Sequence, residues 1–153
     1  TTGVDPVSRR EFWDILTQLR VEQGLTIFVS TPYMDEAERC HRVGLMYGGH
    51  LIAVGAPAEI KSMAPGELLE LRPHDWVTAK ALVAGQAGVL EVQTYGDRLH
   101  LFVDDAARRG PELVALLAAH GIACDSPRPL APRLEEAFIS LVRRRQGLKG
   151  VQP

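Results

Sequence analysis

The sequence predicts an α/β chain made of two consecutive units. Over the first 67 residues, helical apolar periodicity alternates with short apolar runs of the strand type. From residue 68 onward, the predicted order is strand, helix, two strands, helix and strand, and a last helix follows. Pro65-Gly66 and Pro73-His74 punctuate the chain between the two patterns. We therefore expect one unit over residues 1–67 and another over residues 68–153.

The composition fits a folded protein and argues against two classes of function. The chain has 153 residues, 46% of them hydrophobic, which is enough for one domain or two small ones. Its net charge of -2 gives no general attraction to nucleic acid or anionic lipid. The longest apolar runs are far shorter than the ~20 residues of a membrane-spanning helix, so we expect membrane association only through a partner.

The first unit opens with a predicted helix. Asp5 can accept hydrogen bonds from free N-terminal amides, and Pro6 suits the first helical position. Gly24 supplies the stop after Gln23. The apolar residues at helical spacing are expected to form one buried face: Phe12, Ile15, Leu16 and Leu19.

Four shorter elements complete the first unit. Leu25–Ser30 is apolar and rich in β-branched and aromatic residues, which predicts a strand buried on both faces of a parallel sheet. Residues 34–41 predict a short helix, and residues 42–55 predict two strands around Gly48-Gly49. A last helix is expected over residues 58–63. The acidic residues of the first of these helices are interpreted as stabilising its N-terminal end rather than as catalytic acids: Asp35, Glu36 and Glu38.

The second unit has the predicted order βαββαβ, which is the ferredoxin-like arrangement. Strands are expected over residues 68–72, 89–95, 98–103 and 122–125, and helices over residues 74–84 and 108–120. One face of the two central strands is more apolar, which suits a sheet covered by helices on one side only. A closing helix is expected over residues 134–145, with Leu134, Ala137, Phe138, Leu141 and Val142 as its apolar stripe. Its basic end complements the helix dipole, through Arg143, Arg144 and Arg145 with Lys149.

Several residue types that often mark sites are interpreted as structural. The two cysteines, Cys40 and Cys124, have no CxxC spacing, which fits packing residues in a reduced compartment. Trp13 and Trp76 are expected to pack in the core rather than to anchor a partner. The histidines show no metal-ligand spacing and are expected at the surface or half-buried: His41, His50, His74, His100 and His120.

Four segments of the chain resemble motifs of the ATP-binding cassette (ABC) ATPases. Gly3-Val4-Asp5 resembles the D-loop, and Ser30-Thr31-Pro32 resembles the switch segment, which usually reads Ser-Thr-His. The run from Arg42 to Ile60 is similar to the end of the nucleotide-binding domain of ABC-2 type exporters, and Leu134-Glu135-Glu136-Ala137-Phe138 resembles the motif that ends their accessory domain. The resemblance implies the C-terminal half of a P-loop NTPase-like ABC ATPase, from the D-loop onward, followed by a small ferredoxin-like accessory domain and its C-terminal helix.

This resemblance implies a function for the full-length parent. Such an ATP-binding subunit couples ATP and Mg²⁺ to export through a membrane-spanning permease subunit. It works with a second ATP-binding subunit, as a homodimer or heterodimer, at the inner face of the cell membrane. The resemblance places Gly3, Val4 and Asp5 at the dimer interface. The chain contains no Gly-x-x-x-x-Gly-Lys-Ser/Thr loop to cradle phosphates, so we expect the chain alone neither to bind ATP tightly nor to hydrolyse it.

Pro32 stands where the family has a histidine that contacts the γ-phosphate. Proline offers no side-chain donor or acceptor and no amide hydrogen, so Pro32 cannot make that contact and no catalytic residue is assigned in this chain. One interpretation is a degenerate cassette that turns nucleotide over slowly. The other is a proline tolerated because this segment has no intact site to protect.

A function of another class also stays open. The chain would then be a non-catalytic regulatory module that binds a ligand or a partner, or that pairs with a copy of itself. For the first unit in isolation, we expect either self-association through residues 25–30 and the face of Phe12 and Leu16, or poor order. Residues 68–145 are expected to fold independently.

Overall fold

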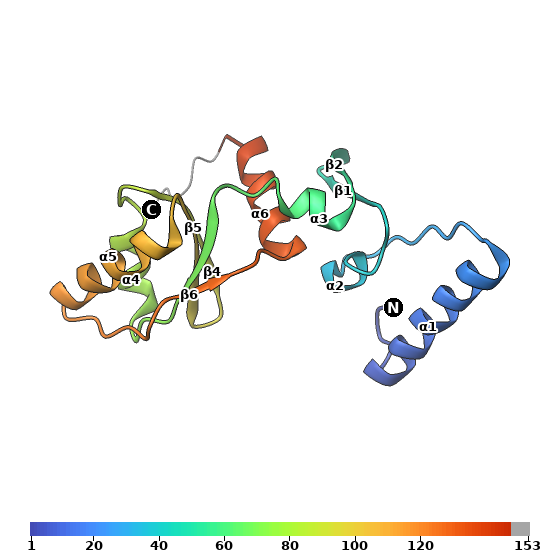
Figure 1. Ribbon diagram of the computed structural model, residues 1–153, viewed down its shortest axis with the longest axis horizontal. Helices are drawn as coiled ribbons and strands as arrows, with labels where there is room; N and C mark the ends of the chain where they lie inside the picture. The colour runs from blue at the N-terminus through green and yellow to red at the C-terminus, as the bar shows by residue number, and fades with distance from the viewer. Residues whose placement is uncertain (148–153) are drawn as a thin grey trace.

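The elements of the chain form two groups, which Figure 1 shows on either side of the last helix. The computed structural model describes residues 1–147. The first group consists of α1 (Pro6–Gln23), α2 (Met34–Ala37), β1 (Val43–Tyr47), β2 (His50–Gly55) and α3 (Pro57–Lys61). The second group consists of β3 (Glu67–Leu71), α4 (Trp76–Val83), β4 (Val89–Tyr95), β5 (Arg98–Val103), α5 (Ala106–Ala119), β6 (Arg128–Leu130) and α6 (Leu134–Arg145).

Helix α1 begins and ends as the sequence predicts, but its buried face was predicted wrongly. Asp5 Oδ1 accepts the amides of Val7 and Ser8, both at 3.0 Å, and Gly24 ends the helix with φ 65°. The expected apolar face stays in solvent, with Phe12 and Ile15 41% and 55% exposed, whereas Trp13 is buried. Figure 1 shows that α1 stands apart from both sheets.

The strand predicted at Leu25–Ser30 is absent, and this prediction was wrong. The segment has no regular secondary structure and crosses from α1 to α2 as an extended chain (Figure 1), in which Phe28 is 94% exposed. A β-strand needs a neighbouring backbone to take up its hydrogen bonds. Within residues 1–147, no segment pairs with this one.

The predicted hairpin is confirmed, and its inner side contributes to a small core. Strands β1 and β2 pair antiparallel, and Gly48 and Gly49 between them both have positive φ, as a tight type I′ turn requires. The expected helix over residues 34–41 is only one turn long, because α2 ends at Ala37. The small core joins α2, the hairpin, α3 and α6 through Ala37, Val43, Leu45, Ile60, Leu134 and Ala137.

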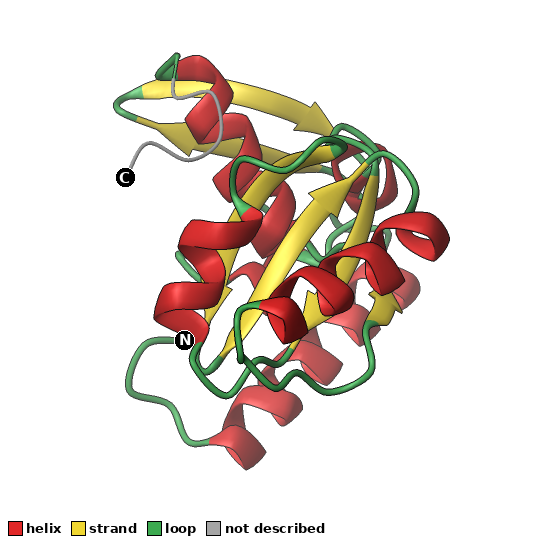
Figure 2. Cartoon of the chain, turned by 90° about the vertical axis from the view of Figure 1, so that its left-hand side faces the viewer, coloured by secondary structure: helices red, strands yellow, loops and turns green. Residues whose placement is uncertain are grey.

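The second group is a four-stranded sheet with the strand order β4-β5-β3-β6, in which all neighbours are antiparallel. Figure 2 shows the strands of this sheet among the helices that pack on it. Helices α4 and α5 cover one face. There, Ala79, Val83, Leu113 and Leu117 of the helices join Leu69, Leu71, Val92, Leu99, Leu101 and Val103 of the strands in the larger core.

The fourth strand of this sheet lies later in the sequence than predicted. Residues 122–125 form no strand, and Cys124 makes only an isolated bridge with Pro73. Strand β6 follows instead, with Pro129 paired opposite Leu69. An edge strand tolerates proline because part of its backbone needs no partner.

Helix α6 has the predicted bounds and covers the second face of the sheet, so the expectation of helices on one side only was wrong. Arg143 Nη1 donates to the carbonyl of Val92 at 2.8 Å and lies 3.1 Å from Glu91 Oε1. The same helix packs on α2 and α3 through the small core. Since α6 contacts both groups, the boundary at residue 67 stays a prediction. Lys149 of the expected basic cluster lies outside the described residues.

Candidate functional site

Thr1, two residues before the D-loop-like segment, and Thr31 of the switch-like segment meet at the carboxylate of Glu36. Thr31 Oγ1 donates to Glu36 Oε2 at 2.6 Å, and the hydroxyl of Thr1 donates to Glu36 Oε1. Glu36 lies in α2 and is only 1% exposed. Thr1 and the residues that follow it are therefore tied to the switch-like segment through one buried side chain.

The charge of Glu36 suits this role. Burial opposes its ionisation, but the hydroxyl hydrogen bonds of Thr1 and Thr31 and the nearby Arg9 outweigh that cost and lower the pKa of Glu36. Arg9 Nε lies 3.8 Å from Glu36 Oε1, and the guanidinium lies 5.2 Å from the ring centre of Tyr33. An ionised carboxylate is a strong acceptor for both hydroxyls.

The predicted site residues around this junction differ in how closely the structure brings them together. Gly3, Val4 and Asp5 are exposed in a turn, where Val4 N donates to the carbonyl of Thr1 at 3.1 Å. Ser30 and Pro32 are exposed, and Thr31 alone of its segment reaches Glu36. The roles of these six residues at a dimer interface and beside a nucleotide stay predictions.

The first turn of α2 carries Asp35 and Glu36, as predicted, but no acidic side chain caps the helix by a hydrogen bond. The N-cap position of α2 is Tyr33, which makes no side-chain capping bond. Glu36 turns instead to Thr1 and Thr31, and Glu38 bonds Lys61. The sequence pattern showed acidic residues at a helix start but not that longer-range partners would take their oxygens.

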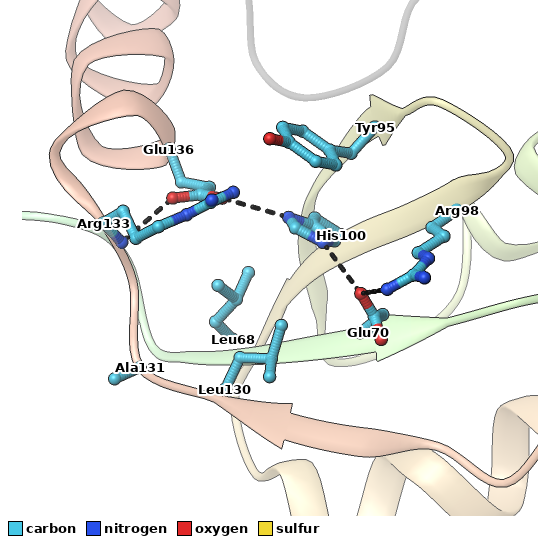
Figure 3. Close-up of a pocket in the computed structure, with 9 residues that line it drawn as sticks. All are labelled: Leu68, Glu70, Tyr95, Arg98, His100, Leu130, Ala131, Arg133 and Glu136. Atoms are coloured by element: carbon cyan, nitrogen blue, oxygen red, sulfur yellow. Dashed lines mark hydrogen bonds and ion pairs between the residues drawn. The ribbon is translucent and has the colours of Figure 1, made fainter. Parts of the chain in front are cut away.

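A second site, which sequence reasoning missed, lies around His100 (Figure 3). This residue is only 3% exposed, so the expectation that it lies at the surface or half-buried was wrong, whereas the other four histidines are exposed. His100 Nδ1 lies 3.2 Å from Glu136 Oε1, and Nε2 lies 3.4 Å from Glu70 Oε2. The available signal was the alternation of side chains along β5. It places His100 on the opposite face of the sheet from Leu99 and Leu101.

A cavity of about 290 Å³ opens beside His100. Tyr95 stacks on the imidazole with 5.1 Å between ring centres, and the guanidinium of Arg133 lies 5.0 Å from the centre of the Tyr95 ring. Leu68, Leu130 and Ala131 supply its apolar lining. Figure 3 shows this apolar side facing the row of polar groups.

The charges of the cavity are balanced within it. Burial opposes ionisation of Glu136, but His100 and Arg133 outweigh it and lower the pKa of Glu136 to about 2. Burial likewise opposes ionisation of Glu70, whose pKa is lowered by Arg98 and His100.

The cysteines and tryptophans give no further site. Cys40 and Cys124 are free and half-buried, and each packs against one of the cores, as predicted. Burial raises the pKa of both thiols. Trp13 is buried as expected, but Trp76 is exposed at the start of α4, so that expectation was wrong. Among residues 1–147, no cluster of histidine, cysteine and acidic side chains is placed to hold a metal ion, and no helix has the length and apolar character to cross a membrane.

Known proteins of one kind are similar to this chain. It is 33% identical over 146 residues to the daunorubicin/doxorubicin resistance ATP-binding protein DrrA of Streptomyces peucetius. This alignment covers 92% of the chain and 44% of that protein. The chain is 34% identical over 147 residues to the Nod factor export ATP-binding protein I of Rhizobium etli, covering 94% of the chain and 43% of that protein. Over 67 residues it is 49% identical to the probable multidrug ABC transporter ATP-binding protein YbhF of Escherichia coli, covering 44% of the chain and 11% of that protein.

The chain thus spans less than half the length of these relatives. No protein-family model matches it. The relatives that cover more than nine-tenths of the chain are ATP-binding proteins of export and resistance systems. Nearly the whole chain is therefore related in sequence to the ATP-binding proteins of ABC transporters, which supports its assignment to the ABC ATPases.

Proposed function

We propose that this chain is the C-terminal segment of the ATP-binding subunit of an ABC exporter. The whole protein couples the binding and hydrolysis of ATP with Mg²⁺ to transport through a membrane-spanning permease subunit. It acts with a second ATP-binding subunit, peripherally at the inner face of the cell membrane. Residues from 68 onward form a ferredoxin-like accessory domain.

The observation that carries this proposal is the match of 33–34% identity along more than nine-tenths of the chain. The junction at Glu36 supports it, because it holds the segment that resembles a switch next to the start of the D-loop-like turn. The antiparallel order β4-β5-β3-β6, with α4 and α5 as the connections, supports the ferredoxin-like description of the accessory domain.

The whole protein tests the proposal directly. We expect it to bind ATP with Mg²⁺ in equilibrium dialysis, and to hydrolyse ATP faster when it is assembled with its membrane partner. Transport into inverted membrane vesicles that carry the complex should require ATP, and a non-hydrolysable ATP analogue should not support it. A whole protein that binds no nucleotide would contradict the proposal.

The chain of 153 residues should not turn over ATP by itself, because its sequence holds no glycine-rich loop with the lysine that binds phosphates. The measurement is phosphate release by the purified chain with Mg²⁺ and ATP, beside the whole protein at equal concentration. Turnover above buffer that persists through further purification would overturn this expectation.

The cavity around His100 favours a second function for the accessory domain, as a regulatory module that binds a small ligand. A concave site with an apolar lining and a few converging polar groups is the usual form of a ligand site. Screening of small charged and aromatic compounds by NMR would test it, with the ring signals of His100 as the reporter. Shifts confined to the surface histidines would count against it.

A further inference from the structure

At the first turn of helix α6, Glu136 Oε2 accepts the amide of Arg133 at 2.9 Å, but the N-cap side chain makes no capping hydrogen bond. The N-cap residue is Arg133, whose guanidinium carries only donors. The free amide of Leu134 donates instead to Glu38 Oε1 at 2.9 Å, across 96 residues of sequence. An N-cap side chain normally accepts the second or third amide of its helix. The first amide of α6 is instead bonded by Glu38, the residue that follows α2.

Glu38 is itself held in place. Lys61 Nζ, at the end of α3, lies 3.1 Å from Glu38 Oε2. Burial opposes ionisation of Glu38, but the amide of Leu134 and the charge of Lys61 lower its pKa below the ordinary value. Next to Glu38, Ala37 packs with Leu134 in the small core. Polar and apolar contacts together therefore fix α2 against α6.

A second carboxylate, that of Glu36 within α2, holds the switch-like segment. Glu36 accepts the hydroxyls of Thr31 and Thr1, and Glu38 follows only two residues later. Glu38 is the C-cap of α2, and its amide donates to the carbonyl of Met34 at 2.9 Å, so we expect a displacement of Glu36 to be passed on to Glu38.

The far end of this connection is the cavity. Glu136 lies in the first turn of α6, two residues after Leu134, and its Oε1 is 3.2 Å from His100 Nδ1. Figure 3 shows Glu136 and Arg133 projecting from this turn toward the imidazole. Three hydrogen bonds therefore connect Thr31 to His100: Thr31 to Glu36, Leu134 to Glu38, and His100 to Glu136. Between them, the backbone joins Glu36 to Glu38 and Leu134 to Glu136.

We propose that Glu38 is a positioning residue that couples the switch-like segment to the cavity around His100. A change in the hydrogen bonding of Thr31 is transmitted through α2 to the start of α6 and moves Glu136 against His100. The functional consequence rests on the proposed function. In an ATP-binding subunit, the coupling makes nucleotide at the switch segment and a ligand in the cavity affect each other's affinity, and such coupling is reciprocal.

The coupling can be measured in the whole protein without nucleotide. The readout is the ring NMR signal of His100, assigned with the variant His100→Gln. Thr31→Val removes the hydroxyl that Glu36 accepts, so we expect the His100 signal to shift. Thr31→Ser keeps the hydroxyl and should restore the wild-type signal. In the background Glu38→Ala, Thr31→Val should no longer move the signal.

The matched control is Asp75→Ala. Asp75 Oδ1 accepts the amide of Thr78 at 3.1 Å and so caps α4, a helix that takes no part in the connection. Asp75→Ala removes a cap of the same kind as Glu38→Ala does. In this background, Thr31→Val should still shift the His100 signal. Loss of the shift in both backgrounds would mean that any lost cap abolishes it, and would overturn the proposal.

Amide exchange at Leu134 gives a second, local readout. Glu38→Ala should speed the exchange of this amide about five- to tenfold, the usual consequence of losing a helix cap, and Asp75→Ala should leave it unchanged. Glu38→Gln keeps the volume and one acceptor oxygen but not the charge. It is the variant to use where Glu38→Ala does not fold, and an intermediate exchange rate is expected.

A nucleotide arm separates this proposal from the proposed function. Addition of ATP should shift the His100 signal in the wild type but not in Glu38→Ala. The Kd for ATP should differ little between the two proteins. If the whole protein binds no ATP, the proposed function fails while the Thr31→Val arm still decides the coupling. An unchanged His100 signal in Thr31→Val, or an equal shift with and without Glu38, would overturn the coupling even in a protein that binds ATP.

Discussion

Buried carboxylates join distant parts of this chain at the level of single residues. Glu36 is 1% exposed and Glu136 is 2% exposed, and each accepts hydrogen bonds from more than one segment. An ionised carboxylate away from water is costly unless its oxygens are bonded, so these positions constrain several neighbours at once. The loss of one such carboxylate leaves its donors unpaired.

Glu136→Gln should lower the free energy of unfolding by about 2 kcal/mol near neutral pH, because His100 and Arg133 lose a charged partner. The pKa of Glu136 in the folded protein is about 2, against an ordinary value of 4.5. A lowered pKa stabilises the fold above the ordinary value, and this contribution is lost as the pH falls toward the folded value. The difference between wild type and variant should therefore be largest above about pH 5 and shrink toward pH 2.

Urea unfolding at a series of pH values measures this difference. Glu135→Gln is the matched control, since Glu135 lies in the same helical turn but is exposed. It should change the stability only slightly at any pH. A difference for Glu136→Gln that stays constant down to pH 2 would contradict the assignment of the stabilisation to the ionised carboxylate.

Pro32→His should raise ATP turnover by the whole protein, if the site is complete in its other parts. The expected rise is on the order of 10²-fold, the usual value of one hydrogen-bond donor at a transition state. Pro32→Ala is the control, because it removes the proline ring and restores the backbone amide without supplying a side-chain donor, and it should leave turnover unchanged. No rise in a Pro32→His protein that still binds ATP would argue against a deficient catalytic site.

At the level of elements, the sequence predicts those that are stabilised by their own residues. Helix α1 carries its own cap and stop, and the β1–β2 hairpin has two glycines at its turn. Elements that depend on a neighbour were predicted less well. Residues 25–30 have strand composition but no neighbouring strand, and β6 owes its pairing to β3 despite its proline.

The same distinction applies to the candidate sites. Thr31 was found from the sequence, because its segment carries a local motif. His100, Glu70 and Glu136 come from three elements that only the folded sheet and α6 bring together. No spacing in the sequence marks such a cluster, and only the alternation along β5 set His100 on the side away from the larger core.

Asp5→Ala tests the stability of α1 on its own. Loss of the two hydrogen bonds to Val7 and Ser8 should cost about 1 kcal/mol of local helix stability. The amides of these two residues should then exchange about fivefold faster with solvent. Asp14→Ala, at an exposed position inside the same helix, should not have this effect at the first turn, and Asp5→Asn should preserve the cap. Equal exchange in Asp5→Ala and wild type would show that the cap does not hold the helix start.

At the level of the whole molecule, protection should be uneven along the chain. Hydrogen exchange should be slowest in β3, β5 and the helices α4 and α5, which share the larger core. It should be fastest in α1 and residues 24–31, where apolar side chains such as Phe28 are in solvent. Mass spectrometry of peptides from the purified chain measures this profile. Strong protection throughout residues 1–62 in a monomeric sample would contradict it.

Strand β6 protects one edge of the four-stranded sheet against pairing with strands of other molecules, but residues 25–30 have no such protection. It is three residues long with Pro129 in its middle, so a foreign strand that approaches it finds few donors to pair with. Residues 25–30 contain no proline that would hinder such pairing. The run Leu25-Thr26-Ile27-Phe28-Val29-Ser30 is uncharged, free of proline and extended, which is the composition of segments that stack into cross-β fibrils. Fibril formation by concentrated samples should therefore begin at this segment rather than at the β6 edge of the four-stranded sheet.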